Sequence, residues 1–180
     1  MLHKGNDGHN PKKLLPIQPN IGLDLGSRQS VVEILNISLA NEAVLAMKTR
    51  GAHWNVSGTG FLELHKLFEG QYNQLNDAAG EIALRTRMLG GFAMASLEET
   101  LNLTRLEEQP GEIPEILNLL ADHEAAIRFT REDARKCSEE YEDDGSFELL
   151  VSVMHMHEKM AWMLRSLIEP GSDAFQNSAK

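Results

Sequence analysis

The sequence has little that would cross-link the chain or place it in a membrane. It contains a single cysteine, Cys137, so no disulfide can form within the chain, and we expect a reducing compartment such as the cytosol. No apolar run approaches the roughly 20 residues that a membrane-spanning helix needs. The first 26 residues are polar and lack the apolar centre of a secretory signal peptide. These absences argue against a disulfide-held secreted scaffold and against a membrane partner.

Basic residues are also scarce. The 17 Lys and Arg residues stand against 27 Asp and Glu residues, which gives a net charge of −10. This balance disfavours nucleic acid as a partner for the body of the protein and suits a protein that collects cations. The 180 residues are 42% hydrophobic and 24% charged, which is typical of one soluble globular domain with a core of its own.

No stretch alternates as a β-strand does, and there is no internal repeat. Apolar residues instead recur at spacings of three and four, which predicts four long helices. Their approximate ranges are 30–56, 61–88, Pro114 through Cys137, and 146–169, with a short helical piece at 96–103. Ser30 and Glu33 have the form of a capping box at the start of the first helix. Helices of this length are typical of an all-α four-helix bundle, and the long connection predicts a crossover between the second and third helices.

The ends of the chain differ from this body in composition. Residues 1–26 are rich in proline and glycine and lack apolar periodicity, so we predict a flexible N-terminal tail, a bundle over 27–170 and a short C-terminal tail over 171–180. Three lysines make the N-terminal tail slightly basic. Multiplied over many copies, they can bind DNA phosphates weakly and without sequence preference, although the acidic body opposes this. The three are Lys4, Lys12 and Lys13.

The strongest chemical signal lies between Ala52 and Glu69. His53 falls near the end of the first predicted helix, and His65 and Glu69 fall early in the second, after a Ser-Gly-Thr-Gly break. Residues four apart share one helix face, and the reversal at the break can bring His53 towards them. Two imidazoles and a carboxylate suit a divalent first-row metal such as iron or zinc. The alternative is a polar patch at a subunit interface.

Three segments carry a family resemblance: HWNVSGTGFLELHKLFE at 53–69, RTRMLGG at 85–91 and HEKMAWMLRS at 157–166. They closely resemble the DNA-protection-during-starvation (Dps) proteins, which are mini-ferritins. The resemblance implies a ferritin-like four-helix bundle with a short extra helix in the connection, assembled as a dodecameric shell in the cytoplasm. It also implies oxidation of Fe(II) by peroxide or O2, storage of ferric mineral, protection of DNA with possible association with the nucleoid, and no organic cofactor.

The resemblance also implies an iron site shared between two subunits. One chain would supply His53, His65 and Glu69. The other would supply an Asp and a Glu, but these positions are Gly80 and Leu84 here. The ferroxidase site is therefore expected to be atypical, with weaker iron binding, slower oxidation or a single metal. A shell that has lost the oxidase and binds zinc or shelters DNA is the alternative.

Three other side chains are candidate replacements for the two missing carboxylates. Asp77 and Glu81 each precede a vacated position by three residues, which places them about 60° from it around the helix. Otherwise they form a solvated acidic edge. His157 falls on the inward stripe of the last helix, whereas His155 does not, and a hydrogen-bonded core histidine is its alternative role.

Two further features fit the same function. Trp54 could capture oxidising equivalents beside the metal, or it could be an interface aromatic. An acidic run near the end of the third predicted helix could draw in Fe(II) around a three-fold axis of the shell, or it could be a plain solvated loop. The run consists of Glu139, Glu140, Glu142, Asp143 and Asp144.

Overall fold

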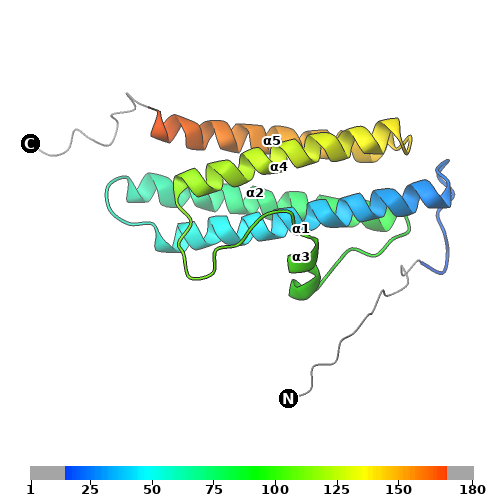
Figure 1. Cartoon of the computed structure of the whole chain (residues 1–180), viewed down its shortest axis with the longest axis horizontal. Coiled ribbons are helices and arrows are strands. Elements are labelled where there is room, and N and C mark those ends of the chain that lie inside the picture. The colour runs from blue at the N-terminus through cyan, green and yellow to red at the C-terminus, as the bar shows by residue number, and fades with distance from the viewer. Residues whose placement is uncertain (1–14, 170–180) are drawn as a thin grey trace, which may run out of the picture.

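The computed structural model describes residues 15–169, and this part of the chain is helical without strands (Figure 1). Its helices are α1 (Leu25–Asn55), α2 (Phe61–Met88), α3 (Leu97–Leu103), α4 (Ile116–Glu139) and α5 (Asp144–Ile168). The prediction of an all-α bundle with a short extra helix in the connection is therefore confirmed. The predicted tail lysines Lys4, Lys12 and Lys13 lie outside the described residues.

The bundle consists of two helical hairpins. α1 packs along α2 and α4 packs along α5, while α1 also contacts α4 and α2 contacts α5. The segment from α2 to α4 crosses over the outside of the bundle and carries α3, which lies against α1 (Figure 1). This is the crossover that the length of the connection predicted.

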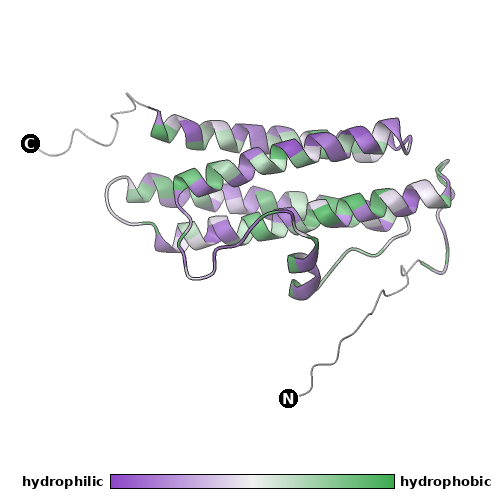
Figure 2. Cartoon of the chain, in the orientation of Figure 1, coloured by the Kyte–Doolittle hydropathy of each residue, from purple (hydrophilic) through white to green (hydrophobic). Residues whose placement is uncertain are grey.

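The core follows the inward stripes of the long helices, each of which carries both apolar and polar residues (Figure 2). Leu45, Phe68 and Leu119 belong to one cluster of buried residues. Leu35 and Ile82 belong to a second cluster. Burial of these stripes stabilises helices that would be marginal in isolation.

The structure moves three helix starts by two residues or more from their predicted positions, and one of them is α4, which begins at Ile116 and not at Pro114. The predicted capping box at Ser30 is wrong, because α1 already begins at Leu25, where the Asp24 carboxylate accepts from the backbone N–H groups of Gly26 at 2.7 Å and Ser27 at 3.1 Å. A capping box does occur at α3, between Ser96 and Glu99. α5 begins at Asp144, two residues before its predicted start.

Residues 15–24 lie against the turn that follows α2. The backbone N–H of Leu15 donates to the carbonyl of Gly90 at 3.2 Å, and the Arg28 guanidinium donates to Gln18 and to the Leu89 carbonyl, both at 2.9 Å. Gly90 has a φ of +84°, and a Cβ there would come within 2.7 Å of Pro19. The turn thus requires glycine for its backbone conformation and for its close contact with the N-terminal segment.

α1 is long and apolar enough to cross a membrane by length and composition, contrary to the sequence-based expectation. Just over half of its most apolar stretch is buried inside the bundle, and the core helix of a soluble protein meets the same criterion. The burial of α1 against its neighbours accounts for its composition.

Candidate metal centre

A glycine-rich turn brings the two candidate histidines together. α1 ends at Asn55 and α2 begins at Phe61, and the connection contains Gly58 and Gly60, with φ values of +84° and +76°. Residues with a Cβ rarely adopt such angles, so these glycines permit the tight reversal. As a result, the last turn of α1, which carries His53, lies beside the second turn of α2, which carries His65.

The two imidazole rings stack on each other, with centroids 3.8 Å apart and planes at 22°. The Nδ1 atom of His53 donates to the backbone carbonyl of His65 at 2.9 Å, and the Nδ1 atom of His65 donates to the carbonyl of His53 at 3.1 Å. A carbonyl oxygen can only accept, so each Nδ1 carries a proton. In the neutral rings, each Nε2 therefore has a lone pair that can bind a metal.

Aromatic side chains surround this pair. Tyr72 meets the edge of the His53 ring at 5.4 Å, and Phe61 lies 5.2 Å from the His65 ring. The Arg50 guanidinium lies 4.9 Å from the centre of the Tyr72 ring. His53 is buried and His65 is half-buried, so their positions are fixed by contacts on several sides. Such preorganisation lowers the entropy lost when a metal binds.

Glu69 lies on α2 one turn after His65 and is exposed. In the described part of the chain, no group of three or more His, Cys, Asp or Glu side chains is arranged to hold a metal ion. The structure therefore brings together His53 and His65 but does not join Glu69 to them. A single chain presents a two-imidazole half-site.

Gly80 and Leu84, the positions where the family has carboxylates, lie farther along α2. At 1.5 Å per residue they are about 22 Å and about 28 Å from His65 along the helix axis, so they cannot approach it within one chain. A Cβ on Gly80 would meet open space, and Leu84 is 54% exposed. Asp77 and Glu81 are exposed on the same helix. Only the α2 helix of a second copy could bring these positions to the imidazole pair.

Trp54 follows His53 at the end of α1, and its side chain is 63% exposed. Other large apolar side chains are exposed nearby in sequence, Phe61 and Leu62 at the start of α2 among them. Trp54 is therefore an exposed aromatic residue next to His53 in the chain.

His157 lies deep in the bundle and not at the imidazole pair. Its side chain and that of His123 are 0% exposed, and that of Glu42 is 1% exposed. The Nε2 atom of His157 lies 2.8 Å from Glu42 Oε1, and its Nδ1 lies 2.9 Å from the Nδ1 of His123. Glu42 precedes His53 by eleven residues, about 16 Å along α1. The structure therefore places His157 in a separate hydrogen-bonded chain, while His155 is exposed.

This buried chain contains two residues that the sequence-based reasoning missed, Glu42 and His123. Glu42 lies at a buried position of α1 between Leu35 and Leu45, where Ser38 and Asn41 are also buried, and His123 lies at a buried position of α4 between Leu119 and Ala126. A polar residue at an inward position of a helix is the sequence feature that could have indicated Glu42 and His123. Burial, with a smaller contribution from His157, holds the pKa of His123 well below its usual value of 6.5, so His123 is neutral.

The acidic run divides into surface and buried members. Glu139, Glu140 and Glu142 are exposed, whereas Asp143 is buried. The Asp143 carboxylate caps α5 by accepting from Ser146 and also accepts from the Arg85 guanidinium at 2.5 Å. Asp143 is therefore committed to the turn between α4 and α5.

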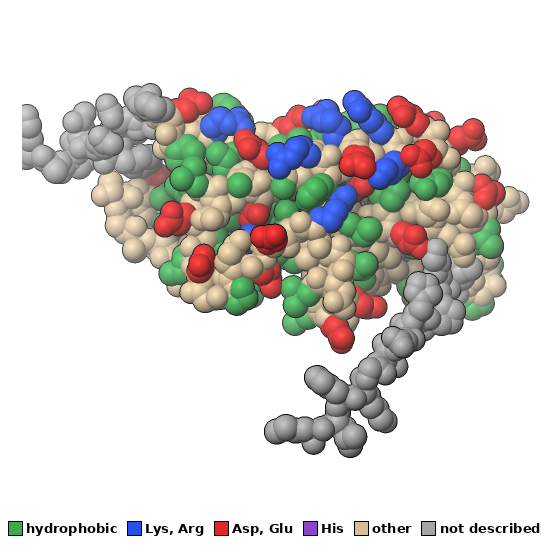
Figure 3. Space-filling view, in the orientation of Figure 1, with side chains coloured by type: hydrophobic (Ala, Val, Ile, Leu, Met, Phe, Trp, Pro, Cys, Tyr) green, Lys and Arg blue, Asp and Glu red, His purple; other side chains and the backbone are tan. Residues whose placement is uncertain are grey.

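No single basic patch covers the face shown in Figure 3, where Lys and Arg side chains alternate with Asp and Glu over α4 and α5. Several of these charges form ion pairs, such as Arg131 with Glu158 at 2.8 Å and Arg165 with Glu124 at 2.6 Å. This face of the described chain does not have the character of a DNA-binding surface.

The order of helices, the crossover and the buried bundle define a ferritin-like protein, and the Ferritin-like domain family matches residues 32–172. The chain belongs to this superfamily and, within it, to the Dps mini-ferritins, as the motif resemblance predicted.

Two relatives and one solved structure illustrate the membership. A low temperature-induced protein of Nostoc sp., described as uncharacterised, is 41% identical over 154 residues, covering 83% of this chain and 86% of the relative. DNA protection during starvation protein 2 of Bacillus anthracis is 30% identical over 143 residues, covering 78% and 97%. The Dps protein of Vibrio cholerae O1, described as a member of a broad superfamily of ferritin-like diiron-carboxylate proteins, is 30% identical with a TM-score of 0.78, covering 84% and 97%.

Proposed function

We propose that the protein is a cytosolic iron-handling mini-ferritin whose ferroxidase site is atypical. It binds Fe(II), oxidises it with peroxide or O2 and stores ferric mineral inside a dodecameric shell, thereby protecting DNA from oxidative damage. Family membership supports the iron chemistry and the shell, and the names of relatives support a role in DNA protection.

The observation that carries this proposal is the stacked pair of His53 and His65. Their two Nδ1–H groups are held by backbone carbonyls, so both neutral rings present Nε2 lone pairs from a fixed scaffold. Imidazole nitrogen with an oriented outer hydrogen bond is a common ligand of iron and zinc. Glu69 completes the proposed ligand set once a second subunit packs against this surface.

The second subunit determines how well the site oxidises iron. Two Fe(II) ions carry four positive charges, whereas two neutral imidazoles and Glu69 supply one negative charge. Gly80 and Leu84 of a second copy add no further charge, and hard oxygen ligands are what ferric iron prefers. We therefore propose slow oxidation or a single metal per site, with Asp77 and Glu81 as substitutes if the two subunits pack with a shifted register. Trp54 then lies where it can take up oxidising equivalents.

The absence of carboxylates at Gly80 and Leu84 also favours a second function. A shell that has lost its carboxylates but kept two imidazoles suits zinc, which takes nitrogen ligands without a need for oxygen donors. Such a protein would bind zinc or shield DNA with little ferroxidase activity. Weak DNA binding through the tail lysines is compatible with both proposed functions.

A measurement of iron oxidation with a matched control variant distinguishes the ferroxidase function from the second function. Fe(II) is added without oxygen, peroxide follows, and ferric absorbance is recorded by stopped flow for the wild type, His65→Ala and His155→Ala. The iron function requires faster oxidation than in buffer, lost in His65→Ala and retained in His155→Ala, because His155 is exposed and outside the site. Oxidation no faster than in buffer, together with zinc bound tightly at His53 and His65, would establish the second function instead.

The entrance for iron is a separate proposal. Glu139, Glu140 and Glu142 are exposed at the end of α4, and three copies around a three-fold axis would concentrate negative potential there. Asp144 lies at the start of α5 and accepts from Ser138 at 3.3 Å. Replacing the three glutamates by glutamine should slow iron uptake without changing oxidation at low iron load.

A further inference from the structure

A groove of about 530 Å³ opens at the end of the bundle where α5 ends and where α1 turns back into α2 (Figure 1). Nine of its twelve lining residues are apolar. Ala52 and Phe68 contribute buried side chains to it, whereas Ile113, Leu117 and Ile168 are 57%, 61% and 39% exposed. Neighbouring apolar side chains with this much exposure are typical of a surface that another group covers.

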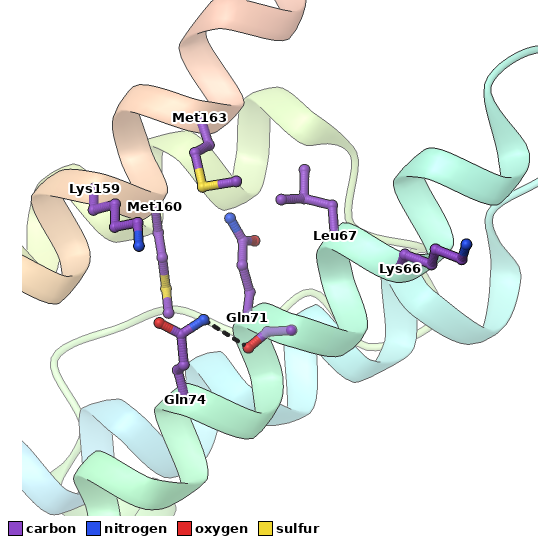
Figure 4. Close-up of a pocket in the computed structure, with 8 residues that line it drawn as sticks. Lys66, Leu67, Gln71, Gln74, Lys159, Met160 and Met163 are labelled. Carbon is purple, nitrogen blue, oxygen red and sulfur yellow. Dashed lines mark hydrogen bonds between the residues drawn. The ribbon is translucent and has the colours of Figure 1, made fainter.

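A second cavity, between α2 and α5, has a different character (Figure 4). It measures about 210 Å³, and half of its eight lining residues are lysine or glutamine. Figure 4 shows the Lys159 side chain beside Met160, and the buried Gln71 amide pointing from α2 towards Met163. The hydrophobic effect therefore favours the larger groove over this cavity as the site for an apolar side chain.

The chain itself continues from the edge of the groove. Ile168 is the last residue of α5 and lines the groove, and the structure describes one residue more, Glu169. Eleven residues follow at 170–180, with the sequence PGSDAFQNSAK, and they lie outside the described residues. Their only large apolar residue is Phe175. The match to the Ferritin-like domain family ends at residue 172, so Phe175 lies beyond the part of the chain that this family covers.

The spacing is suitable for a return of Phe175 to the groove. Seven residues separate it from Ile168, which is at most about 25 Å of extended chain. Pro170 and Gly171 cannot continue the helix and form a dipeptide that marks turns. A phenyl ring fits the groove with room for neighbouring residues, because a cavity of about 150 Å³ already holds benzene. A group tethered by so short a linker has an effective concentration on the order of millimolar, so even a small contact area can hold it.

We propose that residues 170–180 fold back and dock in this groove of their own chain. The Phe175 ring packs between Ile113, Leu117 and Ile168. This contact removes from water both the only large apolar side chain of the segment and the exposed apolar side chains of the groove, which is the driving force for docking.

The groove adjoins the imidazole pair. Ala52 and Leu64 line the groove and directly precede His53 and His65 in the chain. The docked segment therefore packs against the end of α1 and the start of α2, which carry the two imidazoles. The proposal does not depend on the iron function, because the contact uses none of the metal ligands.

Hydrogen exchange of the full chain, read by mass spectrometry, tests the docking from the side of the groove. The backbone N–H groups of Val56 and Glu115 are hydrogen-bonded, and both residues line the groove. We expect these two groups to exchange about tenfold faster in Phe175→Ala than in the wild type, because the covering segment is released. Gln176→Ala, which changes the next residue but keeps the ring, should leave their exchange unchanged.

A groove variant tests the same contact from the other side. Leu117→Asp places a charge in the groove at an exposed position that the bundle tolerates, and exchange over 172–178 should become about tenfold faster. Leu97→Asp makes the same change at an exposed position of α3, outside the groove, and should leave exchange over 172–178 as in the wild type.

Disulfide trapping identifies the chain that supplies the segment. Cysteines at 113 and 175, introduced as Ile113→Cys with Phe175→Cys, should form a disulfide within one chain, which requires their Cα atoms to come within about 7 Å. Burial raises the pKa of the native Cys137 thiol to about 12, so this residue does not compete. Glu139→Cys with Phe175→Cys is the control, because position 139 lies at the other end of α4.

Three outcomes would overturn the proposal. One is exchange at Val56 and Glu115 that is the same in Phe175→Ala and in the wild type. The second is exchange over 172–178 that responds equally to Leu117→Asp and to Leu97→Asp. The third is a disulfide between positions 113 and 175 that forms only between two chains, which would show that a second copy and not the chain's own segment occupies the groove.

Discussion

The backbone carbonyl of His65 accepts a hydrogen bond from the His53 ring, and the carbonyl of His53 accepts one from the His65 ring, at 2.9 and 3.1 Å. Each histidine thus fixes the orientation and the tautomer of the other. The His53 carbonyl is among the last four of α1, which have no partner within the helix, so it is free to accept from the His65 ring across the reversal. The arrangement leaves the Nε2 atom of each ring outside these bonds, and under the proposed function Glu69 and a second subunit supply the remaining ligands.

Restoring the two carboxylates should strengthen the metal centre. In Gly80→Asp combined with Leu84→Glu, we expect the initial rate of peroxide-driven Fe(II) oxidation to rise about tenfold or more, because oxygen ligands stabilise the ferric product. Both positions are exposed, so the fold should tolerate the change. Asn73→Asp with Asn76→Asp adds the same charge to exposed positions of α2 and serves as the control. An unchanged rate in the first variant, with a wild type that is already fast, would contradict the proposed role of positions 80 and 84.

The Glu42–His157–His123 chain should stabilise the bundle. Glu42→Ala removes the acceptor for a fully buried imidazole and leaves a cavity, so we expect a loss of about 2–4 kcal/mol. Glu42→Gln keeps an acceptor and should lose less. Thermal unfolding at fixed protein concentration measures the effect, with the exposed Glu148→Ala as a control. Equal melting temperatures for Glu42→Ala and Glu148→Ala would show that the buried contact is unimportant.

Stability should depend on pH through His123. Its folded-state pKa is depressed by burial, so below the unfolded value of 6.5 the unfolded chain binds a proton that folded His123 does not. The stabilising contribution is therefore complete above pH 6.5 and is lost as the pH falls below it. The loss approaches about 1.4 kcal/mol per pH unit for one proton. Unfolding measured from pH 7.5 to 5.5 should show a flatter dependence in His123→Gln than in the wild type or in exposed His155→Gln. Parallel curves for all three proteins would exclude this contribution.

Within the acidic run, we expect the buried Asp143 to stabilise the fold and the exposed glutamates to affect iron entry and not stability. Asp143→Ala removes the cap of α5 and the buried partner of Arg85, and we expect it to destabilise the chain by about 2–4 kcal/mol. Asp143→Asn retains an acceptor for the cap and should lose less. Glutamine at 139, 140 and 142 should leave the melting temperature within a degree or two of the wild type. A large destabilisation by those three exposed substitutions would contradict this division.

Periodicity in the sequence predicted the long helices because each one repeats apolar residues at three and four. It was less successful at the helix starts: Ser30 and Glu33 fit a capping box, yet Asp24 caps α1 six residues earlier. Caps depend on one local hydrogen bond, and several residue pairs near a helix start satisfy the same pattern. His157 was correctly placed on an inward stripe, but its partners were missed, because Glu42 and His123 are 115 and 34 residues away from it in the chain.

The sequence by itself determined the helical bundle, the glycine reversal that joins α1 to α2, and the family to which the chain belongs. These follow from short-range spacing and from motifs that are contiguous in the chain. Only the tertiary structure decided that His53 and His65 exchange hydrogen bonds, that Asp143 is bound to Arg85, and that His157 is bonded to Glu42 and His123. Such contacts depend on how four helices are rotated and aligned against one another, and a rotation of a few tens of degrees about one axis would change all of them while leaving the periodicity of each helix intact.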